Sequence, residues 1–255
     1  VDEFQDISRS RYRLIKALLD QSQEHKLFCV GDDWQSIYRF TGSDVSIMTS
    51  FEELFQPSEI TYLPDTFRFS TQILDVSSRF IMKNRAQMPK ELVAAEAGDT
   101  LQVCLVACND INEALVDCLD TIDLMESGAA DVFVIGRYNH SAPTRLKRIA
   151  EQFPRLNIRY LTAHKSKGLE ADYVLVVGLN SGRYGFPCKI EDDPVLNLVL
   201  YKDEPLLYAE ERRVFYVALT RARKKVCMFH DRSQPSEFVE EILEDEAPLH
   251  CVETP

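Results

Sequence analysis

Two acidic residues stand side by side at the start of the chain, where VDEFQD (1–6) places Asp2 next to Glu3. At the end of a strand, one such carboxylate can hold Mg²⁺, and the next acid can orient and deprotonate an attacking water. The pair alone is weak support for this chemistry, because a solvated turn also carries adjacent acids. Its interpretation depends on the segments that follow.

A second polar segment, GDDWQSIYRFTGSD (31–44), follows a short apolar run. Gln35 offers an amide that can donate to a phosphate oxygen, and Tyr38 and Phe40 are two aromatic residues close to a flexible turn. Aromatic faces in such a setting suit the stacking of unpaired bases. Ile37 is expected in the core, and for the two aromatics base stacking and core packing remain equal alternatives.

Five segments in order resemble the motifs of the UvrD/Rep-type superfamily 1 DNA helicases, and the short spacing between the third and fourth resembles the helicase IV-like branch. They are VDEFQD, GDDWQSIYRFTGSD, YLPDTFRFS (62–70), YLTAHKSKGLEADYVLVVGL (160–179) and EERRVFYVALTRARKKV (210–226). Five ordered motifs over nearly the whole chain make a chance match negligible. The resemblance implies a RecA-like P-loop NTPase fold with ATP and Mg²⁺ as cofactors.

The resemblance assigns a role at an ATP site to seven residues. In the first two motifs, Asp2 would hold Mg²⁺, Glu3 would activate water and Gln35 would sense the γ-phosphate. The later motifs would supply an aromatic that stacks on adenine, two arginines that reach the phosphates and an acid on the ribose side: Phe67, Arg68, Arg221 and Glu170. Phe67 stands where the family often has Tyr.

The resemblance also implies contacts with single-stranded DNA by Tyr38, Phe40, Thr162 and His164. Phe40 replaces the usual Trp, so it keeps a stacking face but loses area and the indole N–H. Thr162 and His164 could bond phosphate oxygens. Without the resemblance, a lone histidine would more often be structural.

Other cations near these motifs have a simpler interpretation. Lys165 and Lys167 are expected to be exposed lysines and are weaker candidates for DNA contact. Arg213 and Arg223 are expected to have a structural role, on a solvated helix face or paired with neighbouring glutamates.

Strands alternate with helices along the chain, which predicts an α/β fold with a parallel sheet. The predicted strands are 27–32, 59–63, 101–107, 131–137, 158–163, 172–179 and 225–230. The predicted helices are 9–24, 44–55, 70–85, 109–127, 141–152 and 207–219, and the acidic segment 237–246 is expected to be a solvated helix face. The predicted domains are a partial RecA-like domain (1–63), a complete one (64–245) and a tail (246–255).

Composition narrows the functional class. The formal charge of −12 argues against nonspecific coating of nucleic acid but allows a local basic groove. No apolar stretch approaches the length of a membrane span, and the seven scattered cysteines suit a reduced, cytoplasmic protein.

No GxxxxGK[ST] loop occurs in the sequence, so we expect a fragment whose phosphate-binding loop lies upstream, in the N-terminal part of the same motor. We also expect the block 1–63 to be less ordered than 64–245, because it lacks upstream strands.

The expected function is part of an ATP-dependent helicase or translocase in DNA repair or recombination. It would act on single-stranded DNA and duplex junctions, with 3′→5′ polarity implied by the family alone, and the fragment by itself would be inactive. Two alternatives remain: the motor of a helicase–nuclease, and a nucleic-acid-binding or regulatory module without ATP turnover.

Overall fold

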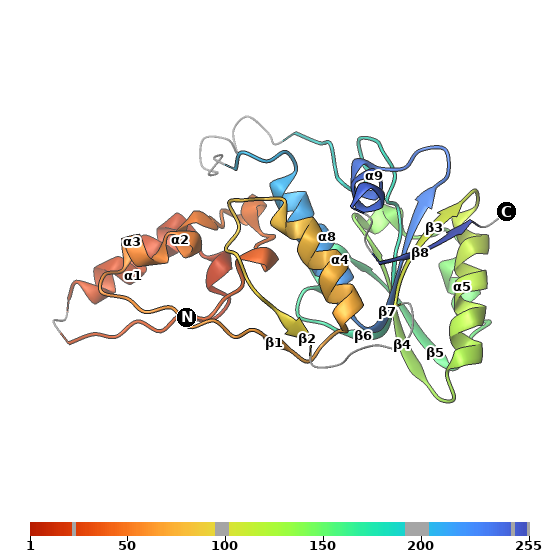
Figure 1. Cartoon of the computed structure of the whole chain (residues 1–255), viewed down its shortest axis with the longest axis horizontal. Helices are drawn as coiled ribbons and strands as arrows, with labels where there is room; N and C mark the ends of the chain where they lie inside the picture. The colour runs from red at the N-terminus through yellow and green to blue at the C-terminus, as the bar shows by residue number, and fades with distance from the viewer. Residues whose placement is uncertain (22–23, 95–101, 192–203, 246–247, 254–255) are drawn as a thin grey trace.

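The computed structural model describes residues 1–21, 24–94, 102–191, 204–245 and 248–253. Within these residues the central feature is a parallel sheet of six strands (Figure 1). Its order is β5 (Leu156–Thr162), β4 (Ala130–Gly136), β6 (Ala171–Val176), β7 (Ala222–Asp231), β3 (Val103–Cys108) and β8 (His250–Glu253). The predicted α/β class with a parallel sheet is confirmed.

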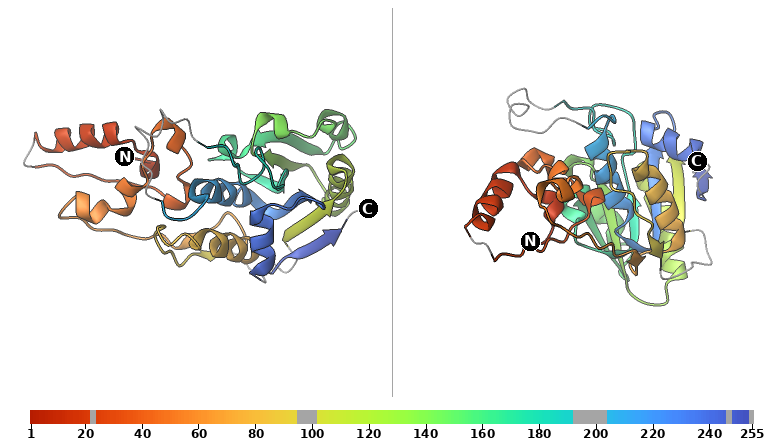
Figure 2. Two further views of the ribbon diagram at one scale, coloured as in Figure 1. Left: turned by 90° about the horizontal axis from the view of Figure 1, so that it is seen from above. Right: turned by 60° about the vertical axis from the view of Figure 1, so that its left-hand side comes forward.

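Helices cover both faces of this sheet. One face is covered by α4 (Thr71–Met82), α8 (Ala209–Leu219) and α9 (Glu237–Glu244), and the other by α5 (Ile111–Met125) and α6 (Leu146–Ala150) (Figures 1 and 2). Successive residues of β4 alternate between the two cores, with Phe133 and Ile135 on the α8 side and Val132 and Val134 on the α5 side. Because both faces are buried, the central strands are continuous apolar runs.

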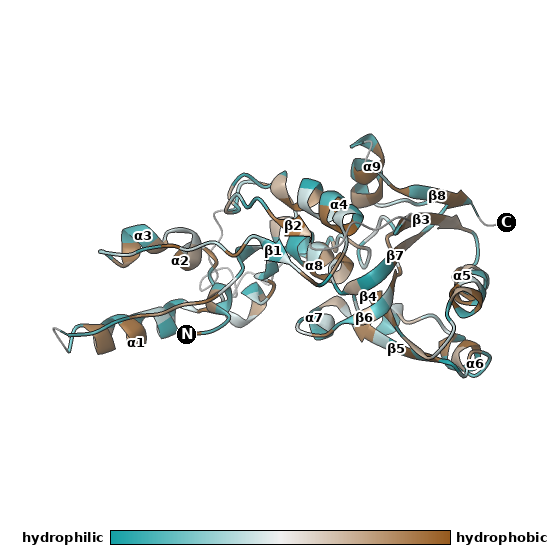
Figure 3. Ribbon diagram, turned by 60° about the horizontal axis from the view of Figure 1, so that its bottom comes forward, coloured by the Kyte–Doolittle hydropathy of each residue, from teal (hydrophilic) through white to brown (hydrophobic). Residues whose placement is uncertain are grey.

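The first 63 residues form short elements that extend away from the sheet (Figure 1). They are η1 (Phe4–Asp6), α1 (Arg9–Leu19), η2 (Asp33–Gln35), η3 (Arg39–Thr41), α2 (Ser46–Thr49) and α3 (Phe51–Leu54), where η marks a 3-10 helix. A small core of Phe4, Ile7, Ile47 and Phe55 joins η1, α1, α2 and α3. No residue of α1 is fully buried: Ile15 and Leu19 pack partly against this small core, whereas Leu14 and Leu18 are exposed. Figure 3 shows apolar and polar residues alternating along α1.

The segment around η2 belongs to the main core instead. Trp34 and Ile37 are completely buried in the same cluster as α4 and α8. The Trp34 indole meets the Tyr216 ring edge-on at 5.4 Å, and its Nε1 donates to the Met88 carbonyl at 3.0 Å. This packing fixes the loop that carries Gln35 and Tyr38 against α8.

Two predicted strands are absent from the described residues. Residues 27–32 are extended, and the Phe4 amide donates to the Val30 carbonyl at 2.9 Å, but they form no named strand. Residues 59–63 are irregular, and the short strand β1 (Asp65–Thr66) follows them, paired with β2 (Val93–Ala94). The run 27–32 has only a short hydrogen-bonded neighbour, since Val30 bonds with Val1 and Phe4, and no bond of this kind is found along 59–63 in the described residues.

Other elements differ in extent. The predicted helix 44–55 is divided into α2 and α3. Of the predicted helix 141–152, only the short α6 is an α-helix, and the 3-10 helix η4 (Asn139–Ser141) ends where the predicted helix begins. Helix α9 is not a solvated face, since it buries Phe238, Val239 and Ile242. In the predicted tail, β8 pairs with β3 as an edge strand of the sheet. No described helix is long and apolar enough to cross a membrane.

Candidate active site and nucleic-acid interface

The adjacent carboxylates lie at an exposed turn before η1. Glu3 has a left-handed backbone (φ 49°), unusual for a residue with a side chain, and its amide donates to Asp2 Oδ1 at 2.9 Å. The Glu3 carboxylate accepts from Gln5 Nε2 at 2.5 Å and lies 3.3 Å from Lys167 Nζ. The turn thus aims Glu3 toward groups that come from later in the chain.

A chain of hydrogen bonds runs from this turn to the segment after α8. The Gln5 side-chain oxygen accepts from the Asp32 amide at 3.0 Å, and Asp32 Oδ2 accepts from Gln35 Nε2 at 2.6 Å. Gln35 Oε1 in turn accepts from Arg221 Nη2 at 3.4 Å. The structure therefore brings together three of the predicted site residues, Glu3, Gln35 and Arg221, through two polar side chains that the sequence analysis did not assign.

Arg221 is almost completely buried, with 1% of its surface exposed. Its Nε donates to the Val217 carbonyl at 2.8 Å, whereas the buried Nη1 has no hydrogen-bond partner among the described residues. Burial, and then the nearby positive charge of Arg68, lower the pKa of Arg221 to about 10, so the guanidinium is still charged at neutral pH. A buried charge with an unpaired donor is costly unless an anion accepts from it.

The sheet explains why Glu170 lies near Arg221. Glu170 immediately precedes β6 and Arg221 immediately precedes β7, and the two strands begin side by side where the Ala171 amide donates to the Arg221 carbonyl at 3.0 Å. Glu170 Oε1 accepts from Arg68 Nε at 2.6 Å. Phe67, next to Arg68, is 85% exposed and is free to stack on a ligand.

The residues around Arg221 fit a nucleoside triphosphate. Two guanidinium groups, an unpaired buried donor and an exposed aromatic ring match phosphates and a base. Among the described residues, no group of three or more histidine, cysteine, aspartate or glutamate side chains is arranged to hold a metal ion. A single carboxylate such as Asp2 still fits Mg²⁺, which usually keeps waters and binds nucleotide phosphates alongside one or two carboxylates.

The candidate nucleic-acid contacts form a cluster of three rings. Phe40 and His164 lie 5.4 Å apart between centroids, and Tyr38 lies 6.1 Å from each of them. Phe40 is 54% exposed, so its face is open to an unpaired base. Burial, and then the charge of Arg137, lower the pKa of His164 to about 4, so this ring is neutral at pH 7.

Thr162 has a local role in the structure. It is buried at the end of β5, and its Oγ1 accepts from the Lys165 amide at 3.3 Å as the N-cap of α7 (Ala163–Ser166). This cap starts the short helix that carries His164. In this structure the Thr162 hydroxyl thus helps to position His164.

Two cations differ from their predicted setting. Lys167 is not an exposed lysine, since only 8% of its side chain is accessible. Arg213 is structural as predicted, but it is fully buried, and it pairs with Glu204 at 2.5 Å and donates to the Ser36 carbonyl at 2.6 Å. Arg223 is half-exposed and pairs with Asp172 at 3.3 Å. No local pattern identifies Ser36 as a partner of Arg213 or Asp172 as a partner of Arg223, because these contacts join distant segments.

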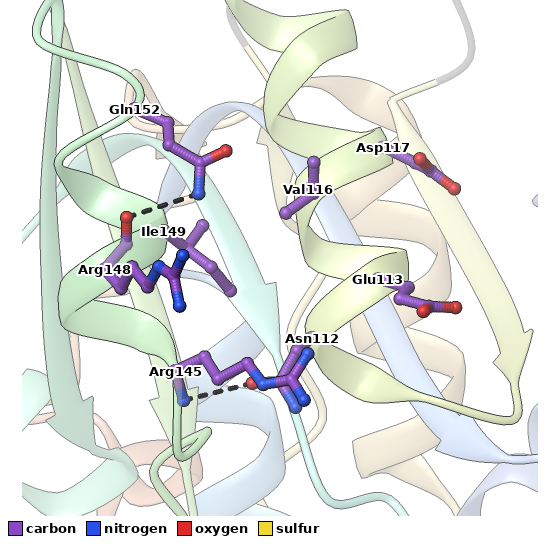
Figure 4. Close-up of a pocket in the computed structure, with 8 residues that line it drawn as sticks. All are labelled: Asn112, Glu113, Val116, Asp117, Arg145, Arg148, Ile149 and Gln152. Carbon is purple, nitrogen blue, oxygen red and sulfur yellow. Dashed lines mark hydrogen bonds between the residues drawn. The ribbon is translucent and has the colours of Figure 1, made fainter.

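An open groove of about 500 Å³ lies elsewhere, between α5 and α6 (Figure 4). Its walls carry Glu113 and Asp117 on one side and Arg145 and Arg148 on the other. No predicted site residue lines it.

Comparison with known proteins identifies the family. Residues 1–56 match the UvrD/REP helicase N-terminal domain, and residues 140–233 match the UvrD-like helicase C-terminal domain. The chain belongs to the UvrD/REP helicase family. The helix-flanked parallel sheet of this UvrD-like chain agrees with the RecA-like fold that the motifs implied.

Among its relatives is DNA helicase IV of Escherichia coli (strain K12), 40% identical over 98% of this UvrD-like chain and 36% of that protein. The putative ATP-dependent DNA helicase YjcD of Bacillus subtilis (strain 168) is 28% identical over 76% of this chain and 24% of its own length. The ATP-dependent DNA helicase PcrA of Staphylococcus epidermidis is 29% identical over 63% of this chain and 21% of its own length. The chain thus spans about a third or less of the length of these relatives.

Proposed function

We propose that this chain is the part of an ATP-dependent DNA helicase that completes the ATP site and grips single-stranded DNA. The observation that carries the proposal is the buried Arg221, whose Nη1 has no hydrogen-bond partner among the described residues, whose Nη2 donates to Gln35 and whose pKa is lowered by the charge of Arg68. Gln35 comes from the segment before β1 and the two arginines from segments after it. Support also comes from the ATP-dependent helicases among the relatives.

Each residue of the proposed ATP site has a distinct role in binding or hydrolysis. Bound Mg·ATP supplies the phosphoanhydride bond whose hydrolysis drives the motor. Glu3 orients and deprotonates the attacking water, and Asp2 is the carboxylate placed to hold the metal. Arg68 and Arg221 stabilise negative charge on the transferred phosphoryl group, and Phe67 stacks on the base. Because Arg221 bonds Gln35 across the two parts of the chain, phosphate contact and domain closure are linked.

On the nucleic-acid side, Tyr38 and Phe40 supply stacking faces, and His164 supplies a neutral ring beside them. The proposal includes 3′→5′ movement, which rests on the family resemblance. It also includes Mg²⁺ as the metal and single-stranded DNA and duplex junctions as the substrates. The chain of 255 residues is proposed to be inactive alone, because its sequence contains no GxxxxGK[ST] loop.

The test compares ATP hydrolysis, with and without single-stranded DNA, by a longer protein that carries this chain together with the upstream phosphate-binding loop. We expect DNA-stimulated turnover, and Arg221→Ala should lower it roughly 10³-fold or more, as expected for an arginine that stabilises the transferring phosphoryl group. Arg223→Ala is the matched control, because this half-exposed arginine lies two residues away and pairs with Asp172.

The same assay separates the proposal from the binding-module alternative. DNA binding without hydrolysis by the longer protein would favour the binding-module alternative. Robust hydrolysis by residues 1–255 alone would overturn the proposed dependence on the upstream loop. Equal activity of Arg221→Ala and Arg223→Ala would remove Arg221 from the catalytic machinery.

A further inference from the structure

Lys167 occupies a central position that its exposed neighbour Lys165 does not share. Its Nζ lies 2.5 Å from Asp6 Oδ2, donates to the Gln35 carbonyl at 2.9 Å and lies 3.3 Å from Glu3 Oε2. Asp6 is mostly buried, and burial raises the pKa of its carboxyl while Lys167 acts in the opposite direction. The ammonium is therefore held in place by a buried partner.

The same ammonium also lies over an aromatic ring of the candidate DNA interface. Lys167 Nζ is 5.1 Å from the centroid of Tyr38, within the range of a cation–π contact. The Tyr38 hydroxyl donates to the His164 carbonyl at 3.4 Å, and His164 and Lys167 come from one short segment after β5. One cation thus contacts both the hydrolytic carboxylate Glu3 and the stacking ring Tyr38.

Glu3 needs such a contact to be oriented. Its side chain is 62% exposed, and in the described structure its carboxylate contacts the side chains of Gln5 and Lys167. Gln5 belongs to the same turn, so it moves with Glu3. Lys167 is the contact that ties the carboxylate to the opposite part of the chain, where the DNA-facing rings are assembled.

We propose that Lys167 is a positioning residue that couples base stacking on Tyr38 to the orientation of the Glu3 carboxylate. This inference rests on the proposed function. A base stacked on the open side of Tyr38 holds that ring against the ammonium, and the ammonium then holds Glu3 Oε2. Without a stacked base, Tyr38 restrains Lys167 less, and the exposed carboxylate samples more orientations. Hydrolysis thereby becomes dependent on single-stranded DNA.

The test is steady-state ATP hydrolysis by the longer protein, with and without saturating single-stranded DNA, after Lys167→Gln. We expect the ratio of the two rates to fall about tenfold, equivalent to about 1.4 kcal/mol. The KM for ATP and the half-saturating DNA concentration should stay within about threefold, because the lysine orients Glu3 and contacts no ligand. Lys147→Gln, an exposed lysine on α6, is the charge-matched control.

A double-mutant cycle separates coupling from a general structural effect. Tyr38→Leu should lower the same ratio, and Lys167→Gln added to it should cause little further loss, since both act on one pathway. If circular dichroism shows that Lys167→Gln does not fold, Lys167→Arg replaces it. The arginine keeps the charge beside Asp6 but moves it relative to Glu3, so the loss should be intermediate.

The remaining outcomes overturn one proposal or the other. Absence of DNA-stimulated hydrolysis in the unmodified longer protein would contradict the proposed function itself. An unchanged ratio in Lys167→Gln, equal losses with and without DNA, or additive losses in the double variant would each reject the coupling role of Lys167 while leaving that function intact.

Discussion

Arg221 keeps a full positive charge in a position that water scarcely reaches. Its Nε and Nη2 have partners in the described structure, but Nη1 has none, and Arg68 adds a second positive charge nearby. Such a group destabilises the folded protein unless an anion neutralises it. The phosphate contact that we propose for Arg221 would supply that anion.

His164, unlike Arg221, is uncharged at neutral pH. Its pKa is lowered from about 6.5 in the unfolded chain to about 4 in the folded one, by burial and by Arg137. Between these values only the unfolded chain binds the proton, so folding stability falls as pH falls through this window. The free energy of unfolding should therefore decrease less between pH 7 and pH 4.5 in His164→Phe than in the unmodified protein. We expect this difference to be on the order of 1–2 kcal/mol.

Urea denaturation of residues 1–255 at the two pH values measures this difference. His140→Phe, at an exposed histidine, serves as the control. If the His164→Phe protein loses as much stability on acidification as the unmodified protein does, the neutral buried ring is not a source of the pH dependence.

At the scale of elements, α8 is a helix without a solvated face. Nine of its eleven residues are buried, including two arginines that connect it to other segments. Arg212 pairs with Glu241 of α9 at 2.5 Å, and Arg213 pairs with Glu204 and donates to the Ser36 carbonyl beside η2. The helix thereby holds the Gln35 segment and the Arg221 segment in one arrangement.

Removal of the negative charge of Glu204, which pairs with Arg213, should destabilise the folded protein. Glu204→Gln leaves the buried guanidinium without its counter-charge, and we expect a loss of about 3–5 kcal/mol in the free energy of unfolding. Urea denaturation measures it, with Glu240→Gln on the exposed side of α9 as the control. A loss below about 1 kcal/mol would mean that Arg213 finds other compensation, for example from Gln87.

For the whole molecule, the first 63 residues do not behave as one block. Trp34 and Ile37 lie in the same core as α8, whereas α1 buries none of its residues. The expectation that 1–63 is less ordered than 64–245 stays a prediction, and the burial of Trp34 and Ile37 adds a division within the first part. Stability is expected to follow buried contacts, segment by segment.

Hydrogen exchange tests this division. We expect amides of residues 34–37 to exchange nearly as slowly as those of α8, and amides of α1 to exchange much faster, because α1 has no fully buried residue and packs only against the small core around Phe4 and Phe55. Mass spectrometry of peptides from residues 1–255 resolves the two segments. Equal protection throughout residues 1–63 would show that the first part is a single cooperative unit.

Local patterns were sufficient for most of the sheet and the family. The strands at 131–137 and 225–230 were predicted because each is buried on both faces and therefore reads as an apolar run. The edge strand β8, with the sequence HCVE, was missed because only one neighbour holds it and most of it is exposed. The run 27–32 has the composition of a strand but no named strand pairs with it in the described structure.

The sequence by itself determined the α/β class, the five motifs and the types of residue available for phosphate and base contact. Tertiary structure alone decided which of them meet. Gln35 reaches Arg221, Tyr38 packs near His164, and Lys167 joins Glu3 to Tyr38. These contacts join residues more than 100 positions apart, and they depend on the order in which parallel strands pair, which no local periodicity encodes.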